Sequence, residues 1–253
     1  MLLLVDVGNT MLKWALAENA EAALGQWQER GAAAHKDIEH LRDVLRGRNI
    51  SRAIVSNVAG KAIRERLQHL LRAVQAKPFE LEWFASVEAL GGIRNSYRNP
   101  AQLGCDRFAA MVGAHALFPK ENLIVTCCGT ATTVDAVSAD GLFIGGMILP
   151  GLGLMASSLA RSTAHLPQVA QHSLSFNPFA SSTNDAITSG CIAAQIGGIE
   201  HAVGLHAKRS GQVLCVLSGG AAKAIAPHLS VSHQIVDNLV LIGLHAVAMT
   251  PSS

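Results

Sequence analysis

The sequence predicts an α/β protein with two similar lobes, each a mixed sheet with helices, that face a cleft. Three observations support this prediction. Strand-like and helical segments alternate along the chain, the pattern restarts at Asn122, and each half opens on an apolar run that ends in a glycine turn with a hydroxyl residue. We expect the lobes to span residues 1–118 and 119–253.

Composition sets the broad class. A chain of 253 residues can form one large domain or two lobes, and 49% hydrophobic with 15% charged residues is typical of a globular protein. A net charge of +2 without a Lys/Arg cluster argues against a nucleic-acid partner. Five cysteines without Cys-x-x-Cys spacing indicate neither a disulfide framework nor a zinc site, which fits a reducing compartment.

The first residues do not match a targeting signal. Met1–Val5 is apolar, but it has no basic flank and Asp6 interrupts it. No stretch of the sequence approaches a transmembrane span. We therefore expect a cytoplasmic protein without a membrane partner.

Apolar and β-branched runs predict the strands of the first half: Leu2–Val7, Met11–Ala17, Ala22–Gln28, Ala53–Ser56 and Phe79–Phe84. Apolar residues spaced three and four apart predict helices over Lys36–Arg46 and Lys61–Val74. Gly91–Pro100 is expected to be a loop. Gly104–Leu117 is expected to be a helix with Asp106 in its first turn.

The second half repeats this order. Its expected strands are Leu123–Cys127, Ala131–Val137, Leu142–Leu149, Val213–Leu217 and His233–Val236. Its expected helices are Leu152–Ala160, Asn184–Lys208, a short helix from Ala221, and Leu239–Ala248. A series of three strands, helices and further strands thus occurs twice, which indicates an internal duplication.

The two glycine turns indicate the chemistry. Laying one over the other with a single gap pairs Gly8 with Gly129 and Thr10 with Thr130. Two such turns facing each other would cradle the oxygens of a polyphosphate with their backbone N–H groups. The first turn also has an aspartate before it and a lysine after it, so the sequence predicts an ATP-using phosphotransferase that binds magnesium.

Two aspartates are candidates for the reaction. Asp6 ends a buried strand, where a carboxylate is costly, so it is either a turn-forming residue or a magnesium partner, direct or through water. Asp106 can serve as the general base that a kinase needs beside the attacking hydroxyl. It can equally be an ordinary helix N-terminal aspartate stabilised by the macrodipole, and the residues alone leave both roles open.

The ordered motifs resemble the superfamily of acetate and sugar kinases, actin and the large heat-shock ATPases, and within it the type III pantothenate kinases, or Bvg accessory factor-like proteins. The resemblance covers nearly the whole chain. It implies two actin-like (ribonuclease H-like) lobes facing an ATP cleft, and ATP-dependent phosphorylation of pantothenate to 4'-phosphopantothenate, which opens coenzyme A biosynthesis. The motifs that carry it are Asp6–Lys13, Tyr97 with Pro100, Gly104–Arg107, Gly129–Asp135, Gly145–Gly151 and Thr183–Gly190.

The resemblance also implies roles for individual residues. It makes Asp106 the general base and Asp6 the partner of Mg²⁺. The implied ATP-binding residues are Asp6, Val7, Gly8, Asn9, Thr10, Met11, Leu12, Lys13 and Thr130. The implied pantothenate-binding residues are Tyr97, Gly104, Cys105, Asp106, Arg107 and Thr183. Thr183 is reached across the subunit boundary of a homodimer in that family, although a threonine before an apolar helix is also an ordinary N-cap.

The chain departs from the resembled family at one position. Members that use a monovalent cation carry an aspartate just before the second turn, where this chain has Cys127. A neutral thiol is a poor ligand for K⁺ or NH₄⁺, which argues against a requirement for either ion. Asp135 is a structural or metal-linked residue, and Gly219-Gly220 resembles an adenosine-binding turn.

Two alternatives use the same scaffold. A nucleotide-binding regulatory or assembly protein would have the fold without metabolic catalysis, because fold does not fix function. A polyphosphate or sugar phosphotransferase would keep the chemistry but change the acceptor. Asp106 in its motif favours an enzyme over a binding protein, and the second alternative leaves Tyr97 and Thr183 unexplained.

Overall fold

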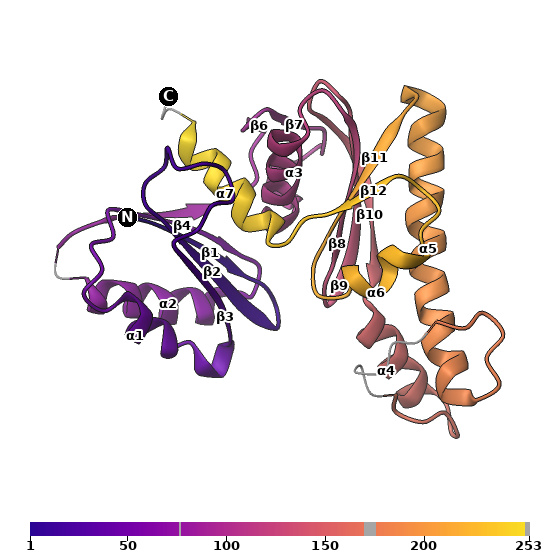
Figure 1. Ribbon diagram of the computed structural model, residues 1–253. Helices are drawn as coiled ribbons and strands as arrows, with labels where there is room; N and C mark the ends of the chain where they lie inside the picture. Colours follow the sequence, from indigo (N-terminus) through magenta and orange to yellow (C-terminus); the bar gives the residue numbers. More distant parts are fainter. Residues whose placement is uncertain (76, 170–175, 251–253) are drawn as a thin grey trace. The chain divides into compact units, whose positions relative to one another are not determined.

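The computed structural model describes residues 1–75, 77–169 and 176–250 and forms two compact units (Figure 1). Unit 1 comprises Met1–Phe118 together with the C-terminal helix α7 (Leu239–Met249), and unit 2 comprises Pro119–Asn238. Each unit has its own sheet and its own hydrophobic core. The expected second lobe, residues 119–253, included α7, whereas α7 belongs to unit 1.

The sheet of unit 1 has the strand order β3-β2-β1-β4-β5. Its strands are β1 (Leu2–Val7), β2 (Met11–Ala17), β3 (Glu29–Ala34), β4 (Arg52–Asn57) and β5 (Glu80–Phe84). β1 pairs antiparallel with β2 and parallel with β4. The remaining elements are α1 (His40–Leu45), α2 (Lys61–Val74), α3 (Cys105–Leu117), the 3-10 turns η1 (His35–Asp37) and η2 (Pro100–Gln102), and the short strands β6 (Ala89–Leu90) and β7 (Ile93–Asn95).

The strands that belong to unit 2 follow the order β12-β11-β8-β9-β10 within their sheet, which repeats this topology. Its strands are β8 (Asn122–Cys128), β9 (Ala131–Val137), β10 (Leu142–Pro150), β11 (Val213–Ser218) and β12 (His233–Ile235). β8 pairs antiparallel with β9 and parallel with β11, as β1 does with β2 and β4. Its helices are α4 (Leu152–Ser162), α5 (Thr183–Ser210) and α6 (Ala222–Ile225), followed by η3 (Ala226–His228). The predicted fold of two similar α/β lobes is confirmed.

The central strand β1 is buried on both faces. Leu3, Val5 and Val7 belong to the core that α1 and α2 complete. Leu2 and Leu4 point to the opposite face, and α7 packs on β1 as well. A strand that is apolar on both faces is typical of a covered, partly parallel sheet, and its one carboxylate stands near its carboxyl end.

Helix α7 packs against α3 within unit 1. Two glycines lie where the helices cross. A Cβ atom added to Gly243 would lie 1.8 Å from the carbonyl oxygen of Ala109, and one added to Gly113 would lie 2.6 Å from that of Leu239. The two backbones therefore touch. Because α7 is apolar on nearly every side, its sequence pattern predicts burial but not the lobe that buries it.

The expected third strand at Ala22–Gln28 is wrong. Gly25 has a φ of 77°, and the Gln26 N–H donates to the Ala23 carbonyl at 2.9 Å, so this segment turns. The third strand is β3, which follows it. Its sequence Glu-Arg-Gly-Ala-Ala-Ala has low strand propensity, and pairing with β2 along its length overrides that propensity.

Two other expectations were partly wrong. The single helix expected over Lys36–Arg46 is divided into η1 and α1, and the loop expected over Gly91–Pro100 contains β7. The other expected elements agree with the observed bounds to within two residues. Among the helices of the described ranges, none is both long and apolar enough to cross a membrane.

Candidate active site

The turn between β1 and β2 is closed by its own backbone. The Gly8 N–H donates to the Met11 carbonyl at 3.1 Å. The register pairs Asp6 with Lys13 across the hairpin, and parallel pairing with β4 places Ser56 on the other side of Asp6. A carboxylate thus stands at the end of the central strand with a cation on the neighbouring strand.

The environment of Asp6 disfavours its charge. Its pKa is raised from 3.8 to about 7, mainly by burial and then by the negative charge of Asp106, while the positive charge of Lys13 opposes the shift. Its Oδ1 atom is buried and has no hydrogen-bond partner among the residues that the structure describes. An orphaned carboxylate oxygen is costly to bury, and it is the ligand type that a hard divalent cation prefers.

These residues fit a magnesium ion that the protein holds only in part. In the described ranges no group of three or more His, Cys, Asp or Glu side chains could hold a metal. Magnesium in phosphate-transferring sites usually takes one or two carboxylates and fills its other positions with water and phosphate oxygens. Asp6, whose buried Oδ1 atom has no hydrogen-bond partner among the described residues, supplies one such carboxylate.

The second aspartate is fixed at the start of α3. The Arg107 N–H donates to Oδ1 of Asp106 at 2.8 Å. Burial raises the pKa of Asp106, and this hydrogen bond and the Arg107 charge partly offset the rise. Gly104 leaves room for the carboxylate, because a Cβ atom there would lie 2.7 Å from Asp106 Oδ1. Gly104 is therefore needed for the position of Asp106.

Cys105 anchors the first turn of α3 to the end of β4. Its Sγ atom lies 3.4 Å from Ser56 Oγ and donates to the Asn57 carbonyl at 3.6 Å. Burial raises the pKa of the Cys105 thiol, so the group stays protonated. Because Ser56 neighbours Asp6 on the sheet, this contact holds α3 and its aspartate beside the first one.

Tyr97 is tied to the same helix. Arg107 is 6% exposed, and its Nη1 atom donates to the Tyr97 hydroxyl at 3.2 Å. The loop before Tyr97 is organised by Asn95, whose Oδ1 accepts from the Tyr97 N–H at 3.1 Å and whose Nδ2 donates to the Pro100 carbonyl at 3.1 Å. Asn95 was not among the residues predicted from the sequence. An asparagine two residues before the tyrosine of a motif loop was the available signal.

His35 is a second residue of the site that was not predicted from the sequence. It lies in η1, and its Nε2 atom is 2.8 Å from the Gly8 carbonyl oxygen in the β1–β2 turn. A carbonyl oxygen only accepts, so the imidazole donates. Nothing in the sequence pattern relates a histidine to a turn 27 residues earlier, because the contact depends on where β3 ends.

The other residues of the hairpin differ in what they can present. Val7 and Leu12 are buried in the core, so only their main-chain groups can serve a ligand. Asn9, Thr10 and Met11 are exposed. A phosphate at this turn would therefore meet backbone N–H groups and short polar side chains.

The second turn, in unit 2, is built from closely packed glycine backbone. The Gly129 N–H donates to the Ala131 carbonyl at 3.0 Å, and the Gly151 N–H donates to the Thr130 carbonyl at 3.0 Å. A Cβ atom on Gly151 would lie 2.2 Å from the Gly129 carbonyl oxygen. Gly219 has a φ of 97°, and the Gly219-Gly220 turn packs against the same segment, 2.4 Å separating a Cβ atom on Gly219 from the Cys128 carbonyl oxygen.

Cys127 occupies the position in β8 that Asp6 occupies in β1. It pairs with Thr133 of β9 as Asp6 pairs with Lys13 of β2. The second turn therefore has a thiol and a hydroxyl where the first has a carboxylate and an ammonium group. Asp135, further along β9, is 1% exposed and is not without an interaction partner, which leaves both the structural and the metal-linked role open.

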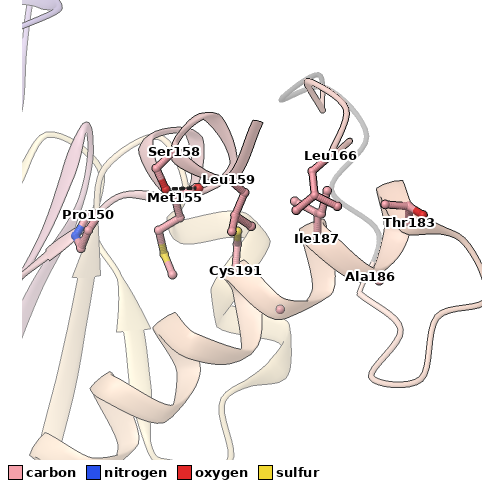
Figure 2. Close-up of a pocket in the computed structure, with 10 residues that line it drawn as sticks. Pro150, Met155, Ser158, Leu159, Leu166, Thr183, Ala186, Ile187 and Cys191 are labelled. Atoms are coloured by element: carbon pink, nitrogen blue, oxygen red, sulfur yellow. Dashed lines mark hydrogen bonds between the residues drawn. The ribbon is translucent and has the colours of Figure 1, made fainter. Parts of the chain in front are cut away.

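Thr183 lies at the edge of an apolar cavity of about 660 Å³ between α4 and α5 (Figure 2). The N-cap of α5 is Ser182, whose Oγ accepts from the Asp185 N–H at 3.2 Å. The N-cap role that the sequence left open for Thr183 is therefore wrong. Thr183 is exposed and is the first residue of α5, beside Ile187 and Leu166 in the cavity wall.

Within unit 1 the structure gathers one acidic and basic group of side chains around the ends of β1, β2 and the start of α3. Its members are Asp6, Lys13, Asp106, Arg107 and Tyr97. The predicted residues Thr130 and Thr183 belong to unit 2. Two carboxylates, two cations and a closed glycine turn are the groups that a phosphoryl transfer uses.

Comparison with known proteins adds a family. The family model described as type III pantothenate kinase matches residues 2–204. A type III pantothenate kinase of Herminiimonas arsenicoxydans is 56% identical and covers 98% of both chains. One of Janthinobacterium sp. (strain Marseille) is also 56% identical, covering 100% of this chain and 99% of the relative.

Solved structures support the fold. A conserved putative Baf family transcriptional activator from Campylobacter jejuni aligns with a TM-score of 0.60 at 18% identity, covering 97% of this chain and 96% of the other. A putative 2-dehydro-3-deoxygalactonokinase protein from Sinorhizobium meliloti aligns with a TM-score of 0.58 at 17% identity, covering 98% of both chains. At these identities the comparison speaks for the actin-like, ribonuclease H-like α/β fold alone.

Proposed function

Because the chain belongs to the type III pantothenate kinase family, we propose how its own residues divide the work of that reaction. The reaction is the ATP-dependent phosphorylation of pantothenate to 4'-phosphopantothenate, the first step of coenzyme A biosynthesis. The observation that carries the proposal is the electrostatically coupled pair Asp6 and Asp106 beside a closed glycine turn.

Asp106 acts as the general base. Its carboxylate accepts a hydrogen bond from the pantothenate hydroxyl and takes the proton as the hydroxyl oxygen bonds to the γ-phosphorus and ADP leaves. The raised pKa of Asp106 brings its basicity closer to neutral pH, where a proton acceptor is most useful. Arg107 N–H fixes the direction of the carboxylate.

The β1–β2 hairpin binds ATP. Because the Gly8 N–H already donates to the Met11 carbonyl, the main chain after Gly8 offers N–H groups to phosphate oxygens, and Lys13 offers its charge. Thr130, in unit 2, also binds ATP. Asp6, through its orphaned Oδ1, would hold Mg²⁺ with phosphate oxygens, and the ion would neutralise charge on the phosphates.

Tyr97, Gly104, Cys105 and Arg107 form the pantothenate side of the site. Arg107 and the Tyr97 hydroxyl are already joined, which presents a charged donor and a phenol together. Gly104 and Cys105 act by placing Asp106. Thr183 contributes from the second subunit of a homodimer. The reaction takes place in the cytoplasm and without dependence on K⁺ or NH₄⁺, because Cys127 lacks the oxygen such an ion needs.

A kinase assay tests this division. Wild-type protein should release ADP only when pantothenate is added, and Asp106→Asn should lower kcat by a factor on the order of 1000 while ATP affinity and the melting temperature stay unchanged. Asp185→Asn, a helix-start aspartate of unit 2, is the matched control and should keep wild-type kcat. An Asp106→Asn variant with near-normal turnover would remove Asp106 from the proposal.

A further inference from the structure

We propose that His35 is a positioning residue that fixes the ATP-binding turn through the carbonyl group of Gly8. The inference rests on the proposed placement of ATP phosphates at the β1–β2 hairpin. The contact is a 2.8 Å hydrogen bond from His35 Nε2 to Gly8 O, made by a side chain from η1. His35 lies outside the Asp6–Lys13 motif, so the residue types and spacing of that motif do not indicate it.

The direction of the Gly8 carbonyl determines the direction of the next N–H. The peptide unit is planar and trans, so the Asn9 N–H points opposite to the Gly8 oxygen. Glycine turns are permissive, and a peptide unit in such a turn can adopt more than one orientation. The donor from His35 selects the orientation in which Gly8 O faces η1 and the Asn9 N–H faces away from it.

His35 is itself held in place from two sides. The Arg66 Nη1 atom of α2 donates to the His35 carbonyl at 3.0 Å, and its guanidinium also lies 3.7 Å from the Glu39 carboxylate. Ile38, three residues after His35, is fully buried in the unit 1 core. The imidazole is therefore mounted on a short turn that is fixed by packing at one end and by a hydrogen bond to its backbone.

This arrangement separates ATP binding from catalysis. His35 contacts neither Asp106 nor the Tyr97 loop in any hydrogen bond between the described residues. Loss of the donor should raise the KM for ATP, because backbone donors are less well ordered before phosphate binds. The kcat and the KM for pantothenate should stay close to wild type.

Steady-state kinetics of three variants test the role. His35→Ala should raise the KM for ATP roughly three- to tenfold, the effect of losing one neutral hydrogen bond. His35→Gln keeps an N–H donor near the Nε2 position and should recover most of the ATP affinity. His40→Ala removes an exposed histidine from the neighbouring α1 and should behave as wild type.

The proposal would be overturned by an unchanged KM for ATP in His35→Ala, or by a His35→Gln variant as impaired as His35→Ala. An equal rise in both KM values would overturn it as well, because that indicates general damage to unit 1. The Lys13→Ala variant distinguishes a failure of the role of His35 from a failure of the proposed ATP site. If Lys13→Ala lowers ATP affinity but His35→Ala does not, only the role of His35 fails, whereas wild-type ATP affinity in Lys13→Ala removes ATP from this turn.

Discussion

The two glycine turns share a backbone and differ in charge. In the first, four residues connect the paired positions Val7 and Leu12, and in the second, three connect Cys128 and Thr132, which accounts for the single gap between them. Asp6 in unit 1 and Cys127 in unit 2 each stand one position before the last paired residue of their strand. Duplication has thus kept the scaffold in both units, while the carboxylate and its cation remain in one.

The turns also differ in what supports them. In unit 1 a side chain, His35, holds the turn from outside. In unit 2 the glycines Gly151 and Gly219 let neighbouring backbone approach the turn directly. Substitutions of residues around the first turn should therefore be tolerated, whereas the second turn should tolerate almost no added atoms.

The largest expected effect comes from giving the first turn the residue of the second. Asp6→Cys should lower kcat/KM by a factor on the order of 100 to 1000, because the site loses the carboxylate oxygen assigned to magnesium. Cys127→Ala should change it less than threefold, because no magnesium ligand is assigned to the second turn. Steady-state kinetics at saturating Mg²⁺ measure both, and equal losses would show that the two turns are functionally equivalent.

A Cβ atom at the second turn should destabilise unit 2. Gly151→Ala places a methyl group 2.2 Å from the Gly129 carbonyl oxygen, which should cost about 2 kcal/mol or more in the free energy of unfolding. Gly8→Ala, whose Cβ atom would meet Met11 O at an ordinary 3.4 Å, should cost less than about 1 kcal/mol. Urea denaturation compares the two, and a Gly151→Ala variant as stable as Gly8→Ala would contradict the packing argument.

The charge of the first turn should appear in the pH dependence of stability. The folded-state pKa of Asp6, about 7, lies above the unfolded value, so the folded protein binds the extra proton between those pH values. Stability should therefore increase as pH falls from about 7 toward 4 through this group. Asp6→Asn removes that increment and should be more stable than wild type at pH 8 by on the order of 2 kcal/mol. Urea midpoints at pH 5 and 8 measure this, with Cys127→Ala as the control that keeps the wild-type slope.

The smallest effect expected is that of potassium. Because the second turn presents a thiol at Cys127, adding K⁺ or NH₄⁺ in place of a bulky organic cation at constant ionic strength should leave the kinase rate unchanged. Initial rates in the two buffers measure it. Strong activation would mean that oxygen ligands other than residue 127 hold the ion.

Sequence patterns predicted the elements whose burial follows a simple period. The bounds of β1, β2 and α2 are those expected, because apolar runs and an amphipathic helix pattern define them locally. Sequence patterns failed where contacts with other elements of the fold determine the structure. β3 forms by pairing despite poor propensity, and α7, apolar all round, joins the unit that offers Gly113 as a contact.

The residues of the candidate site likewise include some that the sequence predicted and some that it did not. The aspartates and glycines of motifs were visible in the sequence because turn and helix-start chemistry limits the residue types that fit there. His35 and Asn95 were not recognised, since their importance comes from carbonyl groups that only the folded chain brings within reach. Residues that position the site through contacts with its backbone are less predictable from sequence than the motif residues that make up the site.

The most direct test of the asymmetry between the turns is the magnesium dependence of the kinase rate. Initial rates with fixed ATP and pantothenate would be measured across Mg²⁺ concentrations for wild type, Asp6→Ala and Cys127→Ala. We expect Cys127→Ala to follow the wild-type curve, whereas Asp6→Ala should need at least roughly tenfold more Mg²⁺ and reach a far lower maximum. An Asp6→Ala curve that coincides with wild type would contradict the assignment of magnesium to the first turn.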